Sequence, residues 1–388
     1  MRTLFWVSAL VVAYVYVGYP LLLAAWARVA ARADRGRKFD APTLPYVSVI
    51  IAARNEAHHL GARLENLLAQ DYPAERLEIV VVSDGSTDDS ERVVRRLSPR
   101  VRYLAVPAGG KALALNAGVR DARHPVLVFA DARQRFAPDA LRRLVAPLAD
   151  PRVGGVSGEL HFDEGGRRRA EGGNDGVGEG VGLYWAYETW IRRKESEVAS
   201  VIGATGAIYA LRKAAWRDLP AETILDDVLT PMRAVLGGYR VVFEPLAQAF
   251  DVVPEDAEVE RRRKTRTLAG NYQLLRLEPR LLVPGVNPVW LQFASHKLGR
   301  LAVPYALIGL IVSNAALASA SLFYSLALIL QVSFYVLALH GATLALTPAP
   351  PPPARPPRVA GAGPRVAPAR LETEVPGRSK EWMNASLD

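Results

Sequence analysis

The sequence predicts an α/β domain with a mostly parallel sheet, held to a membrane by one N-terminal and about two C-terminal transmembrane helices. Short β-branched apolar runs alternate with helical patterns over residues 46–130, which is typical of strand–helix repeats in a parallel sheet. Residues 4–27 contain no Asp, Glu, Lys or Arg, and neither do residues 301–346. These two uncharged segments indicate the membrane helices.

Both uncharged segments are long enough to cross a bilayer, because a hydrocarbon core ~30 Å thick requires about 20 helical residues. A cleaved signal peptide is the alternative for residues 4–27, although its apolar core would span only about 7–15 residues. Residues 301–346 accommodate two helices and a turn near 319–321. Basic residues flank both segments on the side of the intervening domain, which favours the cytoplasm for that domain. They are Arg28, Arg32, Arg35, Arg37, Lys38, Lys297 and Arg300.

These patterns divide the chain into consecutive parts. Residues 1–38 are expected to form a transmembrane anchor with a basic flank, and residues 39–284 a cytosolic domain. Residues 285–346 are expected to form an interfacial segment and two transmembrane helices, and the Pro/Ala/Arg-rich residues 347–388 a disordered tail. The chain is therefore predicted to be a multi-pass protein of the inner (cytoplasmic) membrane with its domain in the cytosol.

Composition narrows the classes of function. The 388 residues include no cysteine, which excludes disulfides, zinc–thiolate sites and thiol nucleophiles. The net charge of +9 suits an anionic membrane surface, nucleic acid or a phosphorylated substrate. Because basic residues gather beside the hydrophobic segments and no nucleic-acid-reading module is recognisable, we expect contact with a membrane and no nucleic-acid partner.

Within the domain, strands are predicted over residues 46–53, 77–83, 101–106 and 125–130. Ligands of open α/β sheets bind beyond the carboxyl ends of the strands, and Glu56, Asp84 and Asp131 follow three of these strands. Their convergence favours a binding site over helix capping, which is the alternative for such residues. No G-x-G-x-x-G follows the first strand, so a dinucleotide-binding domain is disfavoured.

Six motifs follow one another along residues 45–275: "VSVIIAARNE", "IVVVSDGSTDDS", "GGKALALNAG", "VFADARQ", "GATGAIYALR" and "ILDDVLTPMRAVLGGYRVVFEP". In this order they resemble the family 2 glycosyltransferases, which are inverting enzymes with the GT-A fold. When its flanking hydrophobic segments are counted, the chain resembles more closely the membrane-bound polysaccharide synthases of that family. The resemblance implies a GT-A domain that takes a sugar from a nucleotide-diphosphate donor.

The resemblance also implies which residues contact the donor. Glu56 and Asp84 would hold the uracil and ribose of a UDP-sugar, because carboxylates accept hydrogen bonds from ring N–H groups and hydroxyls. Lys111 would lie near the diphosphate, where negative charge develops as the glycosidic bond breaks. Asp131 would lie beside the ribose and diphosphate and contact a divalent cation, Mg²⁺ or Mn²⁺, since hard cations prefer oxygen ligands.

Two positions depart from the family pattern. Arg133 stands where a second aspartate would complete an Asp-x-Asp metal site, so either Asp131, phosphates and water hold the cation, or Arg133 itself neutralises diphosphate charge. Arg263 matches the arginine of the Q-x-x-R-W motif of processive relatives and would contact the donor, whereas Glu260 and Lys264 do not match. Contact with anionic lipid head groups is the alternative for the neighbouring Arg261, Arg262 and Arg266.

The acceptor side is assigned to "GATGAIYALR", where the backbone of Gly203, Gly206 and Ala207 would approach the acceptor closely. An inverting transfer needs one base that deprotonates the acceptor hydroxyl. The resemblance assigns this role to Asp227, with Asp226 as its neighbour. An acidic N-cap on the following helix is the alternative for this pair.

The expected function is transfer of a sugar from a UDP-linked donor to a lipid-linked or polysaccharide acceptor. The process would be exopolysaccharide or cell-envelope glycan synthesis, with polysaccharide-export proteins as partners. A non-catalytic membrane scaffold of a polysaccharide assembly complex is the alternative, because the Asp-x-Asp and Q-x-x-R-W motifs are incomplete. A nucleotidyltransferase with a similar sheet is a third interpretation and would release pyrophosphate.

Overall fold

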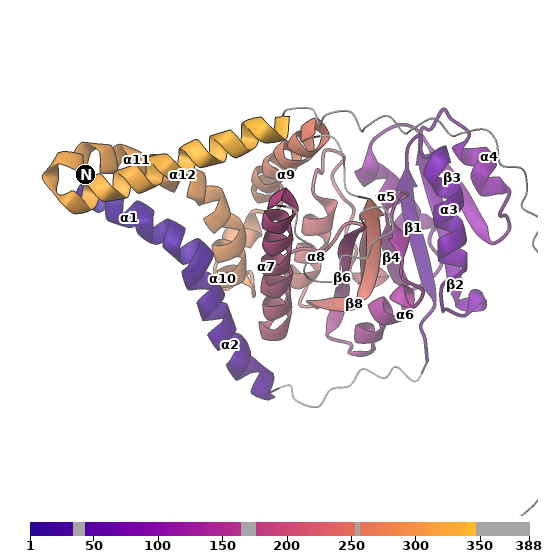
Figure 1. The fold of residues 1–388 in the computed structure, drawn as a ribbon. Coiled ribbons are helices and arrows are strands. Elements are labelled where there is room, and N and C mark those ends of the chain that lie inside the picture. The colour runs from indigo at the N-terminus through magenta and orange to yellow at the C-terminus, as the bar shows by residue number, and fades with distance from the viewer. Residues whose placement is uncertain (34–42, 164–175, 253–256, 347–388) are drawn as a thin grey trace, which may run out of the picture.

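The computed structural model describes residues 1–33, 43–163, 176–252 and 257–346. An α/β domain forms one end of the molecule, and long helices project from it at the other end (Figure 1). The tail predicted over residues 347–388 lies outside the described residues.

The first half of the sheet has the parallel arrangement that the sequence predicts. β1 (Val47–Ala53), β2 (Leu77–Asp84), β3 (Val101–Val106) and β4 (Val126–Ala130) coincide closely with the predicted strands. β1 lies between β2 and β4, β3 lies outside β2, and these pairs are all parallel. Their carboxyl ends therefore meet at one edge, where a ligand site is expected.

The second half of the sheet adds antiparallel strands. Within the described residues, the strand order is β3-β2-β1-β4-β7-β6-β8-β5. β7 (Ile208–Arg212) runs antiparallel to both β4 and β6 (Val153–Asp163), whereas β8 (Arg240–Val252) runs parallel to β6. The short β5 (Arg135–Phe136) pairs antiparallel with β8. The sheet is mixed but mostly parallel, and β7 brings the predicted acceptor segment against β4.

Helices cover both faces of the sheet, which explains why its central strands are apolar on both faces. α3 (Ala57–Leu68), α4 (Ser90–Arg95) and α6 (Ala140–Val145) pack on one face, where Leu60 and Leu144 are fully buried. α5 (Lys111–Asp121) and α8 (Asp226–Leu236) cover the other face, where Leu115 and Met232 are buried. α7 (Gly176–Val198) and α9 (Ala257–Leu277) lie between this domain and the projecting helices (Figure 1).

Three helices in the described part of the chain are long and apolar enough to cross a membrane. The first joins α1 (Arg2–Ala13) to α2 (Tyr19–Ala33) through a π-helical turn, Tyr14–Gly18. The second joins α10 (Trp290–Gln292) to α11 (Gly299–Leu317) through a π-helical turn, Phe293–Leu298. The third is α12 (Leu322–Leu346), and the break before it falls at the turn that the sequence predicts.

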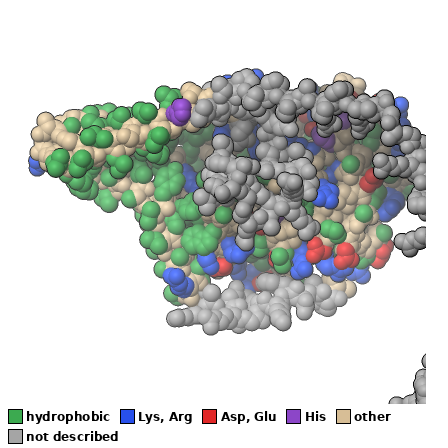
Figure 2. Space-filling model, viewed as in Figure 1, with side chains coloured by type: hydrophobic (Ala, Val, Ile, Leu, Met, Phe, Trp, Pro, Cys, Tyr) green, Lys and Arg blue, Asp and Glu red, His purple; other side chains and the backbone are tan. Residues whose placement is uncertain are grey.

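α1 packs antiparallel against α11. Phe5, near the start of α1, contacts Tyr324 just beyond the end of α11, with ring centroids 5.1 Å apart. A Cβ on Gly309 would lie 2.8 Å from Ser8 Oγ, so glycine allows the two helices to approach closely. Hydrophobic side chains cover the projecting helices, whereas charged side chains gather over the α/β domain (Figure 2).

Candidate functional site

A cavity of about 280 Å³ lies beside the carboxyl end of β4 and is bounded by α7, α8 and α9. Most of the residues that the sequence predicts for the site line this cavity: Lys111, Asp131, Arg133, Gly206, Ala207, Asp226, Asp227 and Arg263. Of the described residues that were also predicted, Glu56, Asp84 and Gly203 do not line it. The fold thus brings the predicted donor and acceptor residues together in one cavity.

Lys111 is the first residue of α5, and its ammonium group forms ion pairs with two carboxylates. Gly110 precedes it with a φ of 93°, a conformation that favours glycine. The Lys111 ammonium lies 3.2 Å from Asp131 Oδ1 and 3.6 Å from Asp226 Oδ2. Burial alone would lower the pKa of Lys111, but the charges of Asp131, Asp226 and Asp227 raise it. A charged lysine at a helix N-terminus suits binding of a phosphate group.

Asp84 supports the loop that leads to Lys111. Its Oδ1 accepts hydrogen bonds from the backbone N–H groups of Gly109 at 2.6 Å and Gly110 at 3.0 Å. Arg54 Nη1 lies 3.9 Å from its other carboxylate oxygen. Asp84 therefore positions the start of α5, and its contact with the nucleoside of a donor stays a prediction.

Glu56 lies immediately before α3, at the carboxyl end of β1. One of its carboxylate oxygens lies 4.0 Å from His59 Nε2. The residue is on the edge of the sheet that the sequence predicts, but outside the cavity wall. Its contact with the base of a donor also stays a prediction.

Residues 203–207 pack directly against the first turn of α8. The Ala204 N–H donates a hydrogen bond of 2.7 Å to the backbone carbonyl of Asp227. A Cβ on Gly203 would lie 3.3 Å from Val228, and one on Gly206 would lie 3.0 Å from Asp227 Oδ2. Glycine at these positions therefore allows the segment to pass beside the Asp227 carboxylate.

Asp227 has the electrostatic environment of a general base. Burial, followed by the negative charge of Asp226, raises the pKa of Asp227 to about 6. The positive charges of Lys111 and Lys297 oppose this rise. A carboxyl group with a pKa close to neutrality takes up a proton from a hydroxyl more readily than an ordinary aspartate does.

Arg133 pairs within the protein at the other end of the cavity. Its Nε lies 3.4 Å from Oδ2 of Asp251, a residue of β8. The same oxygen accepts a hydrogen bond of 2.8 Å from Gln134 Nε2. Arg133, Gln134 and Asp251 all line the cavity together with Asp131, so part of the positive charge of Arg133 is already neutralised.

The oxygen atoms of this region fit a hard divalent cation. Asp131 contributes a carboxylate whose side chain is 37% exposed. Gln134 Oε1 is buried and has no hydrogen-bond partner among the described residues, so a cation would satisfy it. Asp251 adds a second carboxylate from a different strand. Oxygen ligands of this kind are those that Mg²⁺ and Mn²⁺ prefer.

α9 contributes arginines to the cavity. Arg263 lines it, as the sequence predicts, and so do Arg266 and Thr267. Residues three and four apart share one face of a helix, which explains why Arg266 accompanies Arg263. Arg266 thus lies on the cavity side of α9, and contact of this residue with lipid head groups stays an untested alternative. The side chain of Glu260 lies outside the described residues.

α7 forms the far wall of the cavity and connects it to α11. Its lining residues are Trp185, Glu188, Thr189 and Arg192. Glu188 accepts hydrogen bonds from Arg300 at 2.7 Å and faces His296 Nε2 at 3.0 Å. Burial would raise the pKa of Glu188, but the hydrogen bond from His296 and the charges of His296 and Arg300 lower it. Charged pairs thus tie the cavity wall to a candidate membrane helix.

Several residues that line the cavity were not predicted from the sequence. Gln134 lies inside the motif "VFADARQ", so its place in a motif was a usable signal. Asp251 and Arg192 lie in no motif that we recognised, and only the pairing of β8 and the packing of α7 bring them to the cavity.

Comparisons with known proteins agree with this geometry. Residues 48–216 match the family model described as Glycosyl transferase family 2. The chain is 24% identical over 237 residues to a poly-beta-1,6-N-acetyl-D-glucosamine synthase of Staphylococcus aureus (strain COL). It is 22% identical over 237 residues to a protein of the same name from Staphylococcus epidermidis. Each match covers 59% of this chain and 55% of the relative, so the chain spans about half the length of these relatives.

One solved structure is similar over most of both chains. It is the mannosyltransferase PcManGT from Pyrobaculum calidifontis in complex with GDP-Man and Mn²⁺. The TM-score is 0.63 at 27% sequence identity, and the match covers 89% of this chain and 92% of that one. The overall fold, including the projecting helices, therefore has a known counterpart.

Proposed function

We propose that this chain, whose residues 48–216 match the model of glycosyl transferase family 2, is a membrane-bound inverting glycosyltransferase of that family. Its donor would be a nucleotide-diphosphate sugar, UDP-linked, and its acceptor a lipid-linked or polysaccharide hydroxyl group in exopolysaccharide or cell-envelope glycan synthesis. One observation carries the proposal. A cation at a helix N-terminus, Lys111, and a partly buried carboxyl group, Asp227, whose pKa is about 6, share one cavity.

The donor side is the end of the cavity at Lys111. The N-terminus of α5 and the Lys111 ammonium would attract the diphosphate, and Arg263 and Arg266 would add positive charge from α9. The similar mannosyltransferase is in complex with GDP-Man, and the relatives are named as N-acetylglucosamine polymer synthases. Both support a nucleotide-sugar donor, and a donor panel decides between uridine and guanosine.

The acceptor side is the end at Gly206 and Asp227. An acceptor hydroxyl beside Asp227 Oδ2 would lose its proton to this carboxylate as its oxygen bonds to the anomeric carbon of the donor. The bond from that carbon to the diphosphate oxygen breaks, and the electron pair leaves with the nucleoside diphosphate. Lys111 and the α9 arginines stabilise the charge that develops there. Attack from the face opposite the leaving group inverts the anomeric configuration.

A divalent cation, Mg²⁺ or Mn²⁺, would supply additional positive charge to the diphosphate when bound. Asp131 would hold it, with Gln134 Oε1 and Asp251 beside it. The complex of the similar mannosyltransferase with Mn²⁺ supports this assignment. Arg133 would stand where a second aspartate is usual, and its pairing with Asp251 leaves it less positive charge for the donor.

The proposed arrangement in the membrane follows the charges of the chain. Residues 1–38 and 285–346 would anchor the domain of residues 39–284 to the inner membrane. The basic residues beside the spans, such as Arg28, Lys297 and Arg300, favour a cytosolic domain. Nucleotide sugars would then reach the cavity from the cytosol.

A donor panel tests the proposal. The detergent-solubilised full chain is incubated with UDP-N-acetylglucosamine, UDP-glucose and GDP-mannose, each with Mg²⁺, Mn²⁺ or EDTA, and nucleoside diphosphate release is measured. We expect release from one donor class and slower release in EDTA. Binding of donors without release would instead favour the scaffold interpretation, and release of pyrophosphate would favour a nucleotidyltransferase.

A further inference from the structure

We propose that Glu56, His58 and His59 form a site for a divalent transition-metal ion such as Zn²⁺, at the edge of the sheet where the donor is expected. Each of the three residues offers one ligand atom, and these atoms all lie within 4.8 Å of one another. An ion bound there would occupy Glu56, the residue predicted to hold the base of the donor, and would compete with the donor. This consequence rests on the glycosyltransferase function proposed above.

The ligand set fits zinc. Two imidazoles and one carboxylate bind Zn²⁺ with water in the fourth position, at about 2.0–2.2 Å from the ion. Glu56 Oε2 lies 4.0 Å from His59 Nε2, and the ring centroids of His58 and His59 are 3.9 Å apart. Ligand atoms around a tetrahedral zinc ion lie about 3.3 Å from one another, so small rotations of these side chains complete the site.

The three side chains are accessible to an ion and can make those rotations. His58 is exposed, and the side chains of Glu56 and His59 are 34% and 41% exposed. Among the described residues, neither imidazole forms a hydrogen bond, and the charged group nearest to His59 is Glu56 itself. An incoming ion would therefore displace only water from the histidines.

The backbone that carries the ligands is fixed by the neighbouring βα corner. Asn55 has a φ of 56°, and its side-chain oxygen accepts a hydrogen bond of 2.8 Å from the N–H of Thr87. The N–H of Ala57 donates a hydrogen bond of 2.9 Å to Asp88 Oδ2. The start of α3 is thus held in place before an ion binds, which reduces the entropy cost of binding.

Asp88 also opposes the electrostatic penalty for a cation at this place. The N-terminus of a helix carries partial positive charge, which disfavours cations. The Asp88 carboxylate accepts a hydrogen bond from Ala57, the first residue of α3, and Glu56 immediately precedes this helix. Two carboxylates therefore offset the dipole of α3 beside the histidines.

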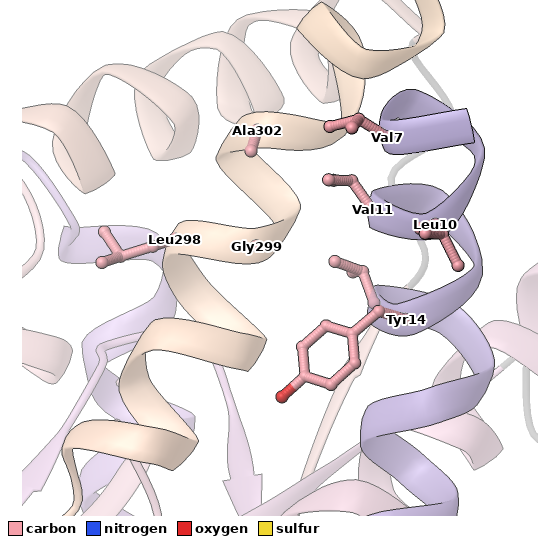
Figure 3. A pocket seen from close by; sticks show the side chains of 8 residues that line it. Val7, Leu10, Val11, Tyr14, Leu298, Gly299 and Ala302 are labelled. Carbon is pink, nitrogen blue, oxygen red and sulfur yellow. The ribbon is translucent and has the colours of Figure 1, made fainter. Parts of the chain in front are cut away.

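The cavity beside β4 and the groove between α1 and α11 suit this ion less well. The cavity offers oxygen atoms of Asp131, Gln134 and Asp251, and no histidine is among its described lining residues. The groove, about 490 Å³ in volume, has apolar lining residues and Tyr14, and none of those described is charged (Figure 3). Oxygen ligands suit Mg²⁺ and Mn²⁺, whereas imidazole suits zinc and copper. Nitrogen ligation therefore distinguishes the proposed site from both.

Metal titrations of the detergent-solubilised full chain, freed of any purification tag, test the proposal. Binding of Zn²⁺ and Mg²⁺ is measured by calorimetry, and one equivalent of bound Cu²⁺ is observed by electron paramagnetic resonance. We expect Zn²⁺ to bind at least about a hundredfold tighter than Mg²⁺, because imidazole prefers the later transition metals. The Cu²⁺ spectrum should show hyperfine coupling to two nitrogen nuclei. A spectrum without nitrogen coupling would overturn the proposal.

Four variants locate the ion. His58→Gln and His59→Gln should each weaken Zn²⁺ binding about tenfold or more, because each removes one ligand. His124→Gln is the matched control, since it removes a half-buried imidazole that packs on Tyr46 with ring centroids 5.3 Å apart, and Zn²⁺ should bind it as it binds wild type. Asp131→Asn should also keep wild-type Zn²⁺ affinity. Unchanged affinity in either His58→Gln or His59→Gln, or an equal loss in Asp131→Asn, would overturn the proposal.

Competition with the donor is measured with uridine, which has no phosphate that could bind the ion itself. At a Zn²⁺ concentration about ten times its dissociation constant, direct competition should weaken uridine binding about tenfold in saturation-transfer NMR titrations. The double variant His58→Gln/His59→Gln should bind uridine equally with and without Zn²⁺. Zn²⁺ binding that leaves uridine affinity unchanged would overturn the competition. Absence of uridine binding to the metal-free protein would contradict only the proposed UDP-linked donor, since the Zn²⁺ titrations judge the metal site by themselves.

Discussion

Substitution of Asp227 by asparagine removes the proposed base and preserves most of its surroundings. Asparagine has the size of aspartate, and the hydrogen bond from Ala204 ends on the backbone carbonyl of residue 227, so the first turn of α8 should persist. General base catalysis typically contributes about 10²–10⁴-fold. Asp227→Asn should therefore slow sugar transfer by about 10²–10⁴-fold, or ~3–5 kcal/mol in the activation barrier.

The pH dependence of the wild-type protein follows from the same residue. The pKa of Asp227 rises from 3.8 to about 6, which disfavours the carboxylate by about 3 kcal/mol. The carboxyl group is protonated below its pKa and is then no base, so kcat/KM should fall about tenfold per pH unit below about pH 6. Asp226→Asn removes a negative charge that raises the pKa of Asp227, so this decline should move to lower pH.

The assay is the initial rate of nucleoside diphosphate release between about pH 4.5 and 8, with UDP affinity measured by calorimetry as the control. UDP affinity of Asp227→Asn should stay within about threefold of wild type, because the side chain is on the acceptor side. Retention of more than about a tenth of the wild-type rate by Asp227→Asn would refute the base assignment. A wild-type profile without a decline near pH 6 would refute it independently.

Three further substitutions follow from the cavity. Lys111→Gln removes a cation that lowers the pKa of Asp227, so the acid decline of kcat/KM should move to higher pH and UDP should bind about tenfold more weakly. Gly206→Ala places a Cβ 3.0 Å from Asp227 Oδ2, so kcat should fall about tenfold while donor affinity is kept. Asp251→Asn leaves the Gln134 amide with a weaker acceptor and should weaken Mn²⁺ binding about tenfold in electron paramagnetic resonance titrations.

Each of these substitutions has a contradicting outcome. An unchanged pH profile of Lys111→Gln would show that its charge does not reach Asp227. Wild-type kcat in Gly206→Ala would show that the added methyl group does not displace the Asp227 carboxylate from its working position. Mn²⁺ affinity that is unchanged in Asp251→Asn but lost in Asp131→Asn would restrict the metal site to Asp131.

The fold of the first half of the domain was predictable because burial on both faces leaves a clear pattern. β1, β2 and β4 are short, mostly apolar runs with several β-branched residues, and such runs followed by polar residues identify the carboxyl edge of a parallel sheet. Asp131 was found for this reason. β7 was harder to predict, since Ile208–Arg212 is short and its antiparallel place between β4 and β6 depends on long-range pairing.

The site was predictable only where its residues lie in local motifs. Lys111, Asp226 and Asp227 lie in motifs and line the cavity. The support that Asp84 gives to Gly109 and Gly110 depends on a contact 25 residues away, and no local pattern signals it. Lys297 looked like an ordinary basic flank of a membrane helix, because its electrostatic effect on Asp227 acts between residues far apart in the sequence.

The stereochemistry of donor cleavage tests the central claim most directly. The wild-type protein is given an α-linked nucleotide sugar in water without acceptor, and the first sugar released is observed by proton NMR before its anomers equilibrate. A single displacement assisted by Asp227 predicts that water enters from the opposite face and that the β-anomer appears first. Initial release of the α-anomer would contradict the inverting mechanism and, with it, the role proposed for Asp227.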